Sequence, residues 1–469
     1  MNDAGFATCK RATSRVAIVA LFLTLPRVLF AQTVTVPAGI GPLPDLQGGA
    51  KVGAVVTKGH IDTYRSLVPP EVAALVDEGD FAFEAVARPR TVEIFGAGSV
   101  GVASSVSIDQ KGLLSPQPES VEGPLFSVAS AEVADGDSKD LAYKILWNTT
   151  THQWRQRSLV GSVSLLAFNE ATDEGRRVDF SVSRIYPAAL GQSPGTLKPM
   201  FREKISAVAP SALSGLTWLT LRFLGADTDY LWAASPITGE VRQMTGSNRA
   251  DPFFSGAFAP DDLFVWSGKV ELVEPSRVAL MPMLVPVIEG TPMPQIVHDG
   301  VCSSTDFSKT SPIDLNLSSK RFEGYPAWVP SNSRMALRNV WRVDVLSRDP
   351  FSRDAKQSIY VDAETSLPVY RVVWRGDGNI QKIVIGMLGS LGGERGGTPG
   401  WRGEVVVTPS SSSVAVVSLH KLEVCSRIIP GRGLLDFDPS HIGSPSTKKP
   451  RSKAPPKVTP AVDPEPVDE

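Results

Sequence analysis

The sequence predicts a mainly β protein, and three observations lead to this prediction. Glycine and proline (40 and 38 of 469 residues) make up about 17% of the chain, against a usual share of roughly 12%, and so many turn residues disfavour a helical bundle. Apolar and polar residues alternate with period two in several segments, most clearly between residues 337 and 386. One segment alone, 69–79, carries a convincing helix pattern. A hydrophobic content of 42% is enough for a sizeable core and excludes bulk disorder.

Residues 1–31 have the three parts of a secretory signal. A basic stretch with Lys10, Arg11 and Arg15 precedes an apolar run of about 11 residues, Val16–Pro26, and the small residue Ala31 precedes the expected cleavage point. The run is too short to span a bilayer, which needs roughly 20 residues. An uncleaved anchor is the alternative. Removal of residues 1–31 would change the net charge from −2 to about −5.

Residues 32–50 predict an irregular N-terminal arm, and a short helix follows. Pro69-Pro70-Glu71 suits a helix start, Val72, Leu75 and Val76 form an apolar stripe, and Gly79 fits the position after the last turn. From residue 80 onward strand patterns dominate. The expected strands are 81–86, 161–168, 179–186, 216–224, 231–234, 339–346, 357–361, 367–374, 380–385, 403–408 and 413–420. Turns at 362–366 and 375–379 make the region from 339 to 385 an antiparallel meander.

The end of the chain, residues 441–469, predicts a disordered tail. Seven prolines and no aromatic residue lie in its last 28 residues, and a basic stretch precedes an acidic one. A solvated end without a partner is the plain interpretation, and contact with a cell-wall polymer or anionic lipid is the alternative. The large body between arm and tail, residues 51–440, is expected to form one β-rich domain.

The cysteines, charges and histidines limit which disulfides, binding partners and metal sites the sequence supports. Loss of the leader would remove Cys9 and leave Cys302 and Cys425, which in an exported protein predict one disulfide, with two buried thiols as the alternative. The charge balance gives no basic footprint for nucleic acid. The five histidines are scattered without paired spacing, so no metal or cofactor is predicted.

Three motif matches fail on physical grounds. Gly191–Gly195 fits GxSxG, but Pro194 follows the serine and has no N–H for an oxyanion. Gly96–Gly101 fits GxGxxG, but the Ser-rich, β-branched stretch after it is a poor helix. Asp135, Asp137 and Asp140 lack the register of a calcium loop and predict a solvated loop. No catalytic group emerges, and an enzyme acting on envelope lipid or polysaccharide is the least favoured function.

Four segments taken in order resemble a known family. They are Lys58–Asp80 (KGHIDTYRSLVPPEVAALVDEGD), Leu141–Asn148 (LAYKILWN), Ala234–Gly268 and the meander Arg338–Ile385. Together they resemble the exported bacterial family called domain of unknown function 1329, which is similar to the LolA/LolB-type outer-membrane lipoprotein-sorting proteins. The resemblance covers roughly residues 50–430.

The resemblance implies a large curved antiparallel sheet, an incomplete LolA/LolB-like β-barrel, with a few short helices or loops as a lid over its concave side. Such a half-closed sheet suits an apolar ligand. Six tryptophans are candidates to line the cavity, with ordinary core positions as the alternative: Trp147, Trp218, Trp232, Trp266, Trp341 and Trp374. Ion pairs that fix a loop near the barrel mouth are expected among Arg242, Arg249, Asp251, Asp261 and Asp262, here called the signature residues.

Two functions are therefore expected in order of preference. The first is a noncatalytic periplasmic binding or carrier protein for a hydrophobic small molecule or acyl chain, linked to outer-membrane lipid or lipoprotein traffic. The second is a structural or accessory module of an envelope export complex, whose cavity is filled by its own side chains and which has an envelope protein partner. In either case the mature chain is expected to be exported without a transmembrane span.

Overall fold

The computed structural model describes 16 stretches of the chain. They are residues 53–86, 106–115, 125–126, 128, 138–152, 158–169, 174–186, 199–225, 227–253, 257–288, 296–298, 301–309, 312–315, 323–391, 399–425 and 434–442. All described residues belong to one compact unit of the chain. The predicted leader, arm and GxGxxG and GxSxG matches lie outside the described residues, as do Asp135, Asp137 and all of the tail except His441 and Ile442.

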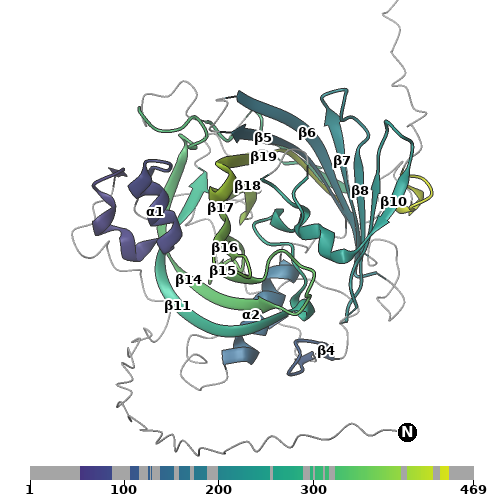
Figure 1. The fold of residues 1–469 in the computed structure, drawn as a ribbon, viewed down its shortest axis with the longest axis horizontal. Coiled ribbons are helices and arrows are strands. Elements are labelled where there is room, and N and C mark those ends of the chain that lie inside the picture. The colour runs from purple at the N-terminus through teal and green to yellow at the C-terminus, as the bar shows by residue number, and fades with distance from the viewer. Residues whose placement is uncertain are drawn as a thin grey trace, which may run out of the picture. The chain divides into compact units, whose positions relative to one another are not determined.

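The predicted fold class is confirmed, because 17 of the described strands join in one large sheet (Figure 1). Its long strands follow one another as antiparallel neighbours in the order β11 (Val273–Ile288), β14 (Ser333–Ser347), β15 (Lys356–Asp362), β16 (Pro368–Trp374), β17 (Ile380–Ser390), β18 (Pro399–Thr408), β19 (Ser413–Cys425), β5 (Ser158–Asn169), β6 (Glu174–Ile185), β7 (Phe201–Ala209), β8 (Thr217–Arg222), β9 (Tyr230–Ala234) and β10 (Val241–Met244). Figure 1 shows this sheet strongly curved.

Short strands are added at two places. Strand β2 (Phe83–Val86) pairs in parallel with β14, and β1 (Ala54–Val56) pairs antiparallel with β2. Strand β13 (Cys302–Asp306) pairs antiparallel with β19, and β12 (Ile296–His298) pairs antiparallel with β13. A second parallel contact joins β11 to β17 at Val287 and Leu388. The sheet is therefore mixed and not antiparallel throughout. Strands β3 (Ser107–Ile108) and β4 (Leu114–Ser115) form a separate pair.

The meander from β14 to β17 is antiparallel, as the sequence predicts. Tyr360 of β15 faces Tyr370 of β16, and Val373 of β16 faces Lys382 of β17. In the turn between β15 and β16, the Asp362 carboxylate accepts the backbone N–H of Thr365 at 2.8 Å, and Ser366 takes a left-handed conformation with φ 56°. Asx-type hydrogen bonds of this kind are the reason that Asp favours turns, so local sequence was sufficient here.

Strand β11 was not predicted, and its three prolines explain why. Proline cannot donate to a strand ladder and argues against a central strand. Along its length β11 pairs with β14 on one side, and on the other it meets β17 at a single residue pair. For most of its length it is therefore an edge strand, where proline is tolerated.

Helix α1 (Pro70–Glu78) confirms the predicted helix. Pro70 occupies its first turn, and Gly79, with φ 94°, donates its N–H to the carbonyls of Leu75 and Val76. Helix α2 (Ser138–His152) was not predicted as a helix. Residues 141–143 and 145–149 are all buried, so the polar face that would reveal a helical period is reduced to a narrow strip. Asp140, expected in a loop, lies in its first turn and pairs with Lys144 at 2.8 Å.

Both faces of the central strands are buried. On β18 and β19, Val405, Val407, Val414 and Val416 pack in one apolar cluster with α1, and the intervening residues pack in a second cluster on the opposite face. This explains the nearly continuous valine runs of these strands. The structure also places Cys302 opposite Cys425 in the β13–β19 pair and joins them by a disulfide, with sulfur atoms 2.01 Å apart.

Candidate functional site

The connection between β10 and β11, residues 245–272, lies against one face of the sheet and is here called the cover segment. Its described part contains three short 3₁₀ helices, η5 (Gly246–Ala250), η6 (Pro260–Asp262) and η7 (Val270–Leu272). At the start of η5 the Asn248 side-chain oxygen accepts the backbone N–H of Thr245 at 3.0 Å and its hydroxyl at 2.9 Å, and Pro260 starts η6. Figure 1 draws the connection in teal, within the curve of the sheet.

The underside of the cover segment is apolar. Phe253, Phe258, Leu263 and Val265 pack in one cluster with side chains of β5, β6, β7, β18 and β19, and this face of those strands is called the inner face. The Phe258 ring lies 6.2 Å from the Phe180 ring, and the Phe253 ring lies 4.9 Å from the Trp218 ring. The inner face is thus covered by irregular chain and not by a second sheet.

A first buried ion-pair group ties the cover segment to β7 and β8. The Arg249 guanidinium donates to Asp261 at 2.7 Å, to Glu203 at 3.1 Å and to the Thr220 hydroxyl at 2.7 Å. Glu203 also accepts from Arg184, and the three side chains of Arg184, Glu203 and Arg249 are at most 1% exposed. Burial opposes ionisation of Glu203, yet the two guanidinium groups hold its pKa below the ordinary value.

A second buried group ties η6 to β16 and β17. The Asp262 carboxylate accepts from Arg371 at 2.8 Å, from Lys382 at 2.8 Å and from the Ala259 N–H at 2.7 Å. Arg371 also donates to Asp354. All four of these charged side chains are at most 3% exposed. One carboxylate of the cover segment is therefore shared by two cations of the sheet.

A third group holds the end of the cover segment. Arg222 of β8 donates to the carbonyls of Ser267 and Gly268, each at 2.9 Å, and to the Asp229 carboxylate at 2.8 Å. Glu271 accepts the backbone N–H of Gly225 at 2.9 Å. Burial raises the pKa of Glu271 against the opposing effect of Lys269.

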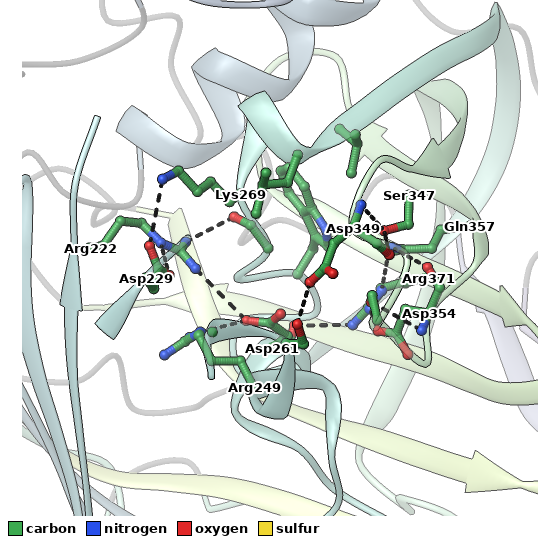
Figure 2. A pocket seen from close by; sticks show the side chains of 17 residues that line it. Arg222, Asp229, Arg249, Asp261, Lys269, Ser347, Asp349, Asp354, Gln357 and Arg371 are labelled. Carbon is green, nitrogen blue, oxygen red and sulfur yellow. Dashed lines mark hydrogen bonds and ion pairs between the residues drawn. The ribbon is translucent and has the colours of Figure 1, made fainter. Parts of the chain in front are cut away.

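A polar pocket lies among these groups. It has a volume of about 50 Å³, and Figure 2 shows Arg222, Asp229, Arg249 and Lys269 on one side and Asp354 and Arg371 on the other, with Asp261 between them. A buried water needs roughly 10–15 Å³ of such volume, so the pocket has room for about three or four waters. It is too small and too polar for an acyl chain.

Glu404 of strand β18 contacts the cover segment where the backbone of that segment is left-handed. Phe264 and Val265 have left-handed backbones, with φ 64° and 69°, which β-branched residues rarely adopt. The Val265 N–H donates to Glu404 of β18 at 2.6 Å. On the neighbouring β17, an added Cβ at Gly386 would lie 2.3 Å from Val265 Cγ2, so glycine at this position makes room for the cover segment.

The signature residues separate into two sets. Arg249, Asp261 and Asp262 lie together in the buried network. Arg242 lies outside it, with a 78% exposed side chain paired to Glu240, and Asp251 lies at the margin, 3.7 Å from Arg353.

The six tryptophans do not gather in one place. Trp147, Trp266 and Trp341 share a cluster with α2, Trp218 lies in the inner-face cluster, Trp232 packs near Phe437, and Trp374 packs near the α1 cluster. Trp147 donates its indole N–H to the Gly112 carbonyl at 2.9 Å. Of the six, Trp266 lines the polar pocket.

Sequence reasoning did not identify the buried charged residues of the sheet that contact the cover segment. They are Arg184, Glu203, Arg371, Lys382 and Glu404. A signal was present in β7, where Glu203 takes an inward position in phase with Phe201, Ile205 and Ala207. A charge in the apolar phase of a strand indicates a buried ion pair. Strands β16 to β18 are buried on both faces, so they offered no such phase.

One described pair has the chemistry of a nucleophile and base. His420 Nε2 lies 2.6 Å from Ser164 Oγ, and burial lowers the pKa of His420. Ser164 is only 2% exposed within β5, out of reach of a substrate. Among the described residues, a group with metal-ligand spacing is Cys302, Glu423 and Cys425, and its two sulfurs form the disulfide. No helix in the described part of the chain is long and apolar enough to cross a membrane.

Comparisons with known proteins gave only structural neighbours. No family model and no curated protein matches the chain. A DUF1329 family protein from Desulfovibrio piger is similar over 65% of this chain and 99% of its own, with 12% identity and a TM-score of 0.43. A domain of the outer membrane lipoprotein-sorting type from Vibrio parahaemolyticus covers 64% of this chain and 97% of its own (12% identity, TM-score 0.42). A LolA superfamily protein from Nitrosomonas europaea covers 62% and 94% (11% identity, TM-score 0.35).

These neighbours include members of the families that the sequence resembles. At such low identities and TM-scores the likeness carries no conclusion about ligand or activity, so the function is argued from the site.

Proposed function

We propose that the chain is a noncatalytic binding or carrier protein for a lipid or another hydrophobic ligand in the periplasm. The observation that supports this proposal is the apolar inner face under an irregular cover segment. Val163, Leu165, Phe180, Val182 and Val417 of that face pack against the cover segment. If the segment moves, it uncovers a curved apolar surface of the kind that suits an acyl chain.

The left-handed backbones of Phe264 and Val265 also support a segment that moves. Non-glycine residues in such conformations persist only when their surroundings hold them, and they cluster at ligand clamps and switch regions. Here the surroundings are Glu404 and the space left by Gly386. Ligand entry would release both contacts together.

One experiment tests the proposal directly. The protein is purified, extracted with organic solvent and analysed by mass spectrometry, and the delipidated protein is titrated with a fluorescent fatty acid. We expect a co-purified apolar molecule and saturable uptake of the probe. Absence of both would contradict the proposal.

A matched pair of glycine variants shows where the ligand enters. In Gly386→Ala the new Cβ would collide with Val265 and lie 3.2 Å from the Val369 carbonyl. Overpacking of this kind costs about 1–3 kcal/mol. If that cost destabilises the covered state, we expect the affinity for the probe to rise by about tenfold.

The control for this prediction is Gly376→Ala in the β16–β17 turn, where an added Cβ meets nothing within 4 Å. It should bind the probe like the unchanged protein. Equal affinities for both variants would place ligand entry elsewhere.

A structural or accessory module of an envelope export complex is the second candidate. The observation that favours it is the small polar pocket, because the chain's own side chains fill the inner face that a ligand would need. Stable envelope partners in a pull-down, together with no extractable ligand, would support this second function.

A further inference from the structure

Glu404 is a buried carboxyl group at the contact between the cover segment and the sheet. Its side chain is fully buried, and its neighbours across the ladder are Gly386 of β17 and Val417 of β19. One oxygen, Oε2, accepts the Val265 N–H at 2.6 Å and the Trp401 indole N–H at 2.9 Å. The other oxygen, Oε1, is buried and has no hydrogen-bond partner among the described residues.

The charges around Glu404 do not neutralise it. Asp262 of η6 disfavours its ionised form and Arg371 of β16 favours it. Arg371 and Lys382 of β17 are both engaged by Asp262. Within the described residues Glu404 itself makes no ion pair. Burial therefore raises the pKa of Glu404 well above its ordinary value, and the neutral acid is the stable form under the cover segment.

Ionisation and coverage then oppose each other. A carboxylate with a buried, unpartnered oxygen gains most from water, and lifting of the cover segment would bring water to Oε1. The left-handed backbone at Phe264 and Val265 adds a local tendency to leave this position once the Glu404 contact is lost.

We propose that Glu404 is a proton-operated latch, which in its neutral form holds the cover segment at Val265 and on losing its proton releases residues 257–268 from the inner face. This inference deepens the proposed function and rests on it in one respect: the uncovered surface is the one that would take the ligand. The latch itself works without ligand, so it can be tested alone.

The direction of the pH effect follows from linkage. The covered state binds the Glu404 proton more tightly than the open state does, so coverage is strongest below the ordinary glutamic acid pKa of 4.5. It weakens as pH rises from there towards the raised pKa of the covered state, and it levels off above that value. One linked proton changes the equilibrium about tenfold per pH unit within this window.

Hydrogen exchange measured by mass spectrometry on the full chain tests the latch. Protection of residues 257–268, corrected for the intrinsic pH dependence of exchange, is compared between pH 5 and 8. We expect protection in the unchanged protein to fall by up to tenfold per pH unit. In Glu404→Gln, which keeps an acceptor for both N–H groups but cannot ionise, it should be independent of pH.

Two further variants keep the test decisive. Glu240→Gln removes an exposed acid just before the cover segment and should leave the pH dependence unchanged. Trp401→Phe removes one donor that stabilises the ionised form in the covered state, so protection should go on falling to a higher pH before it levels off, even if Glu404→Gln does not fold. The same pH slope in all variants would overturn the latch. A normal latch with no uptake of the fluorescent fatty acid would overturn the proposed function alone.

Discussion

Replacing Asp262 by asparagine is expected to destabilise the protein by about 3–5 kcal/mol. The carboxylate is fully buried and shared by Arg371 and Lys382, each at 2.8 Å. Its removal leaves Asp354 as the remaining partner of two buried cations. Removing one member of a buried ion-pair group is costly because the uncompensated charge remains out of water. Urea unfolding followed by fluorescence measures the change in the midpoint.

Asp251→Asn is the matched control for this prediction. Asp251 belongs to the same signature residues, but its side chain is 38% exposed and lies 3.7 Å from Arg353. A surface pair of this kind contributes about 0–1 kcal/mol. Equal destabilisation by the two variants would show that the buried network does not hold the cover segment in the way its geometry indicates.

Replacing Phe258 by alanine is expected to cost about 3–5 kcal/mol, the usual range for a fully buried phenylalanine. Phe258 is 0% exposed, and its ring lies 6.2 Å from the Phe180 ring and 5.4 Å from the Phe253 ring. The variant leaves an apolar hole between cover segment and sheet. Thermal unfolding measures the loss of stability, and the same measurement with a small apolar compound such as benzene measures how much stability returns when the hole is filled.

The stabilisation by benzene tests whether Phe258→Ala leaves an apolar hole under the cover segment. Apolar cavities of this kind bind small apolar molecules, so benzene should raise the unfolding temperature of Phe258→Ala and leave the unchanged protein unaffected. Phe351→Ala is the control, because Phe351 is 82% exposed and its loss should change stability by no more than about 0.5 kcal/mol. A Phe258→Ala protein as stable as this control would contradict the packing of the cover segment on the inner face.

Local sequence was sufficient where a structure depends on neighbours in the chain. Helix α1 followed from Pro70 at its start and Gly79 at its end, and the β15–β16–β17 hairpins followed from period-two alternation and turn residues. Within the candidate site, Arg249 and Asp261 are 12 residues apart, in a segment where ion pairs were expected but no particular pair was named.

Local sequence failed where tertiary contacts reverse a local preference. Helix α2 has only a narrow polar face because residues 141–143 and 145–149 are buried, and β11 holds three prolines because most of its length is an edge. The six tryptophans were grouped by residue type, but residue type does not state to which face of the sheet a side chain points. Their distribution over different clusters follows from strand register and packing.

By itself the sequence determined the β-rich class, the meander and the pattern of turns, because each depends on residues within a few positions of one another. Only the tertiary structure decided which charges are buried and what the cover segment rests on. Asp262 meets Lys382 across 120 positions and Val265 meets Glu404 across 139. Such ion pairs and hydrogen bonds depend on distances that the curvature of the sheet sets, and no short stretch of sequence encodes that curvature.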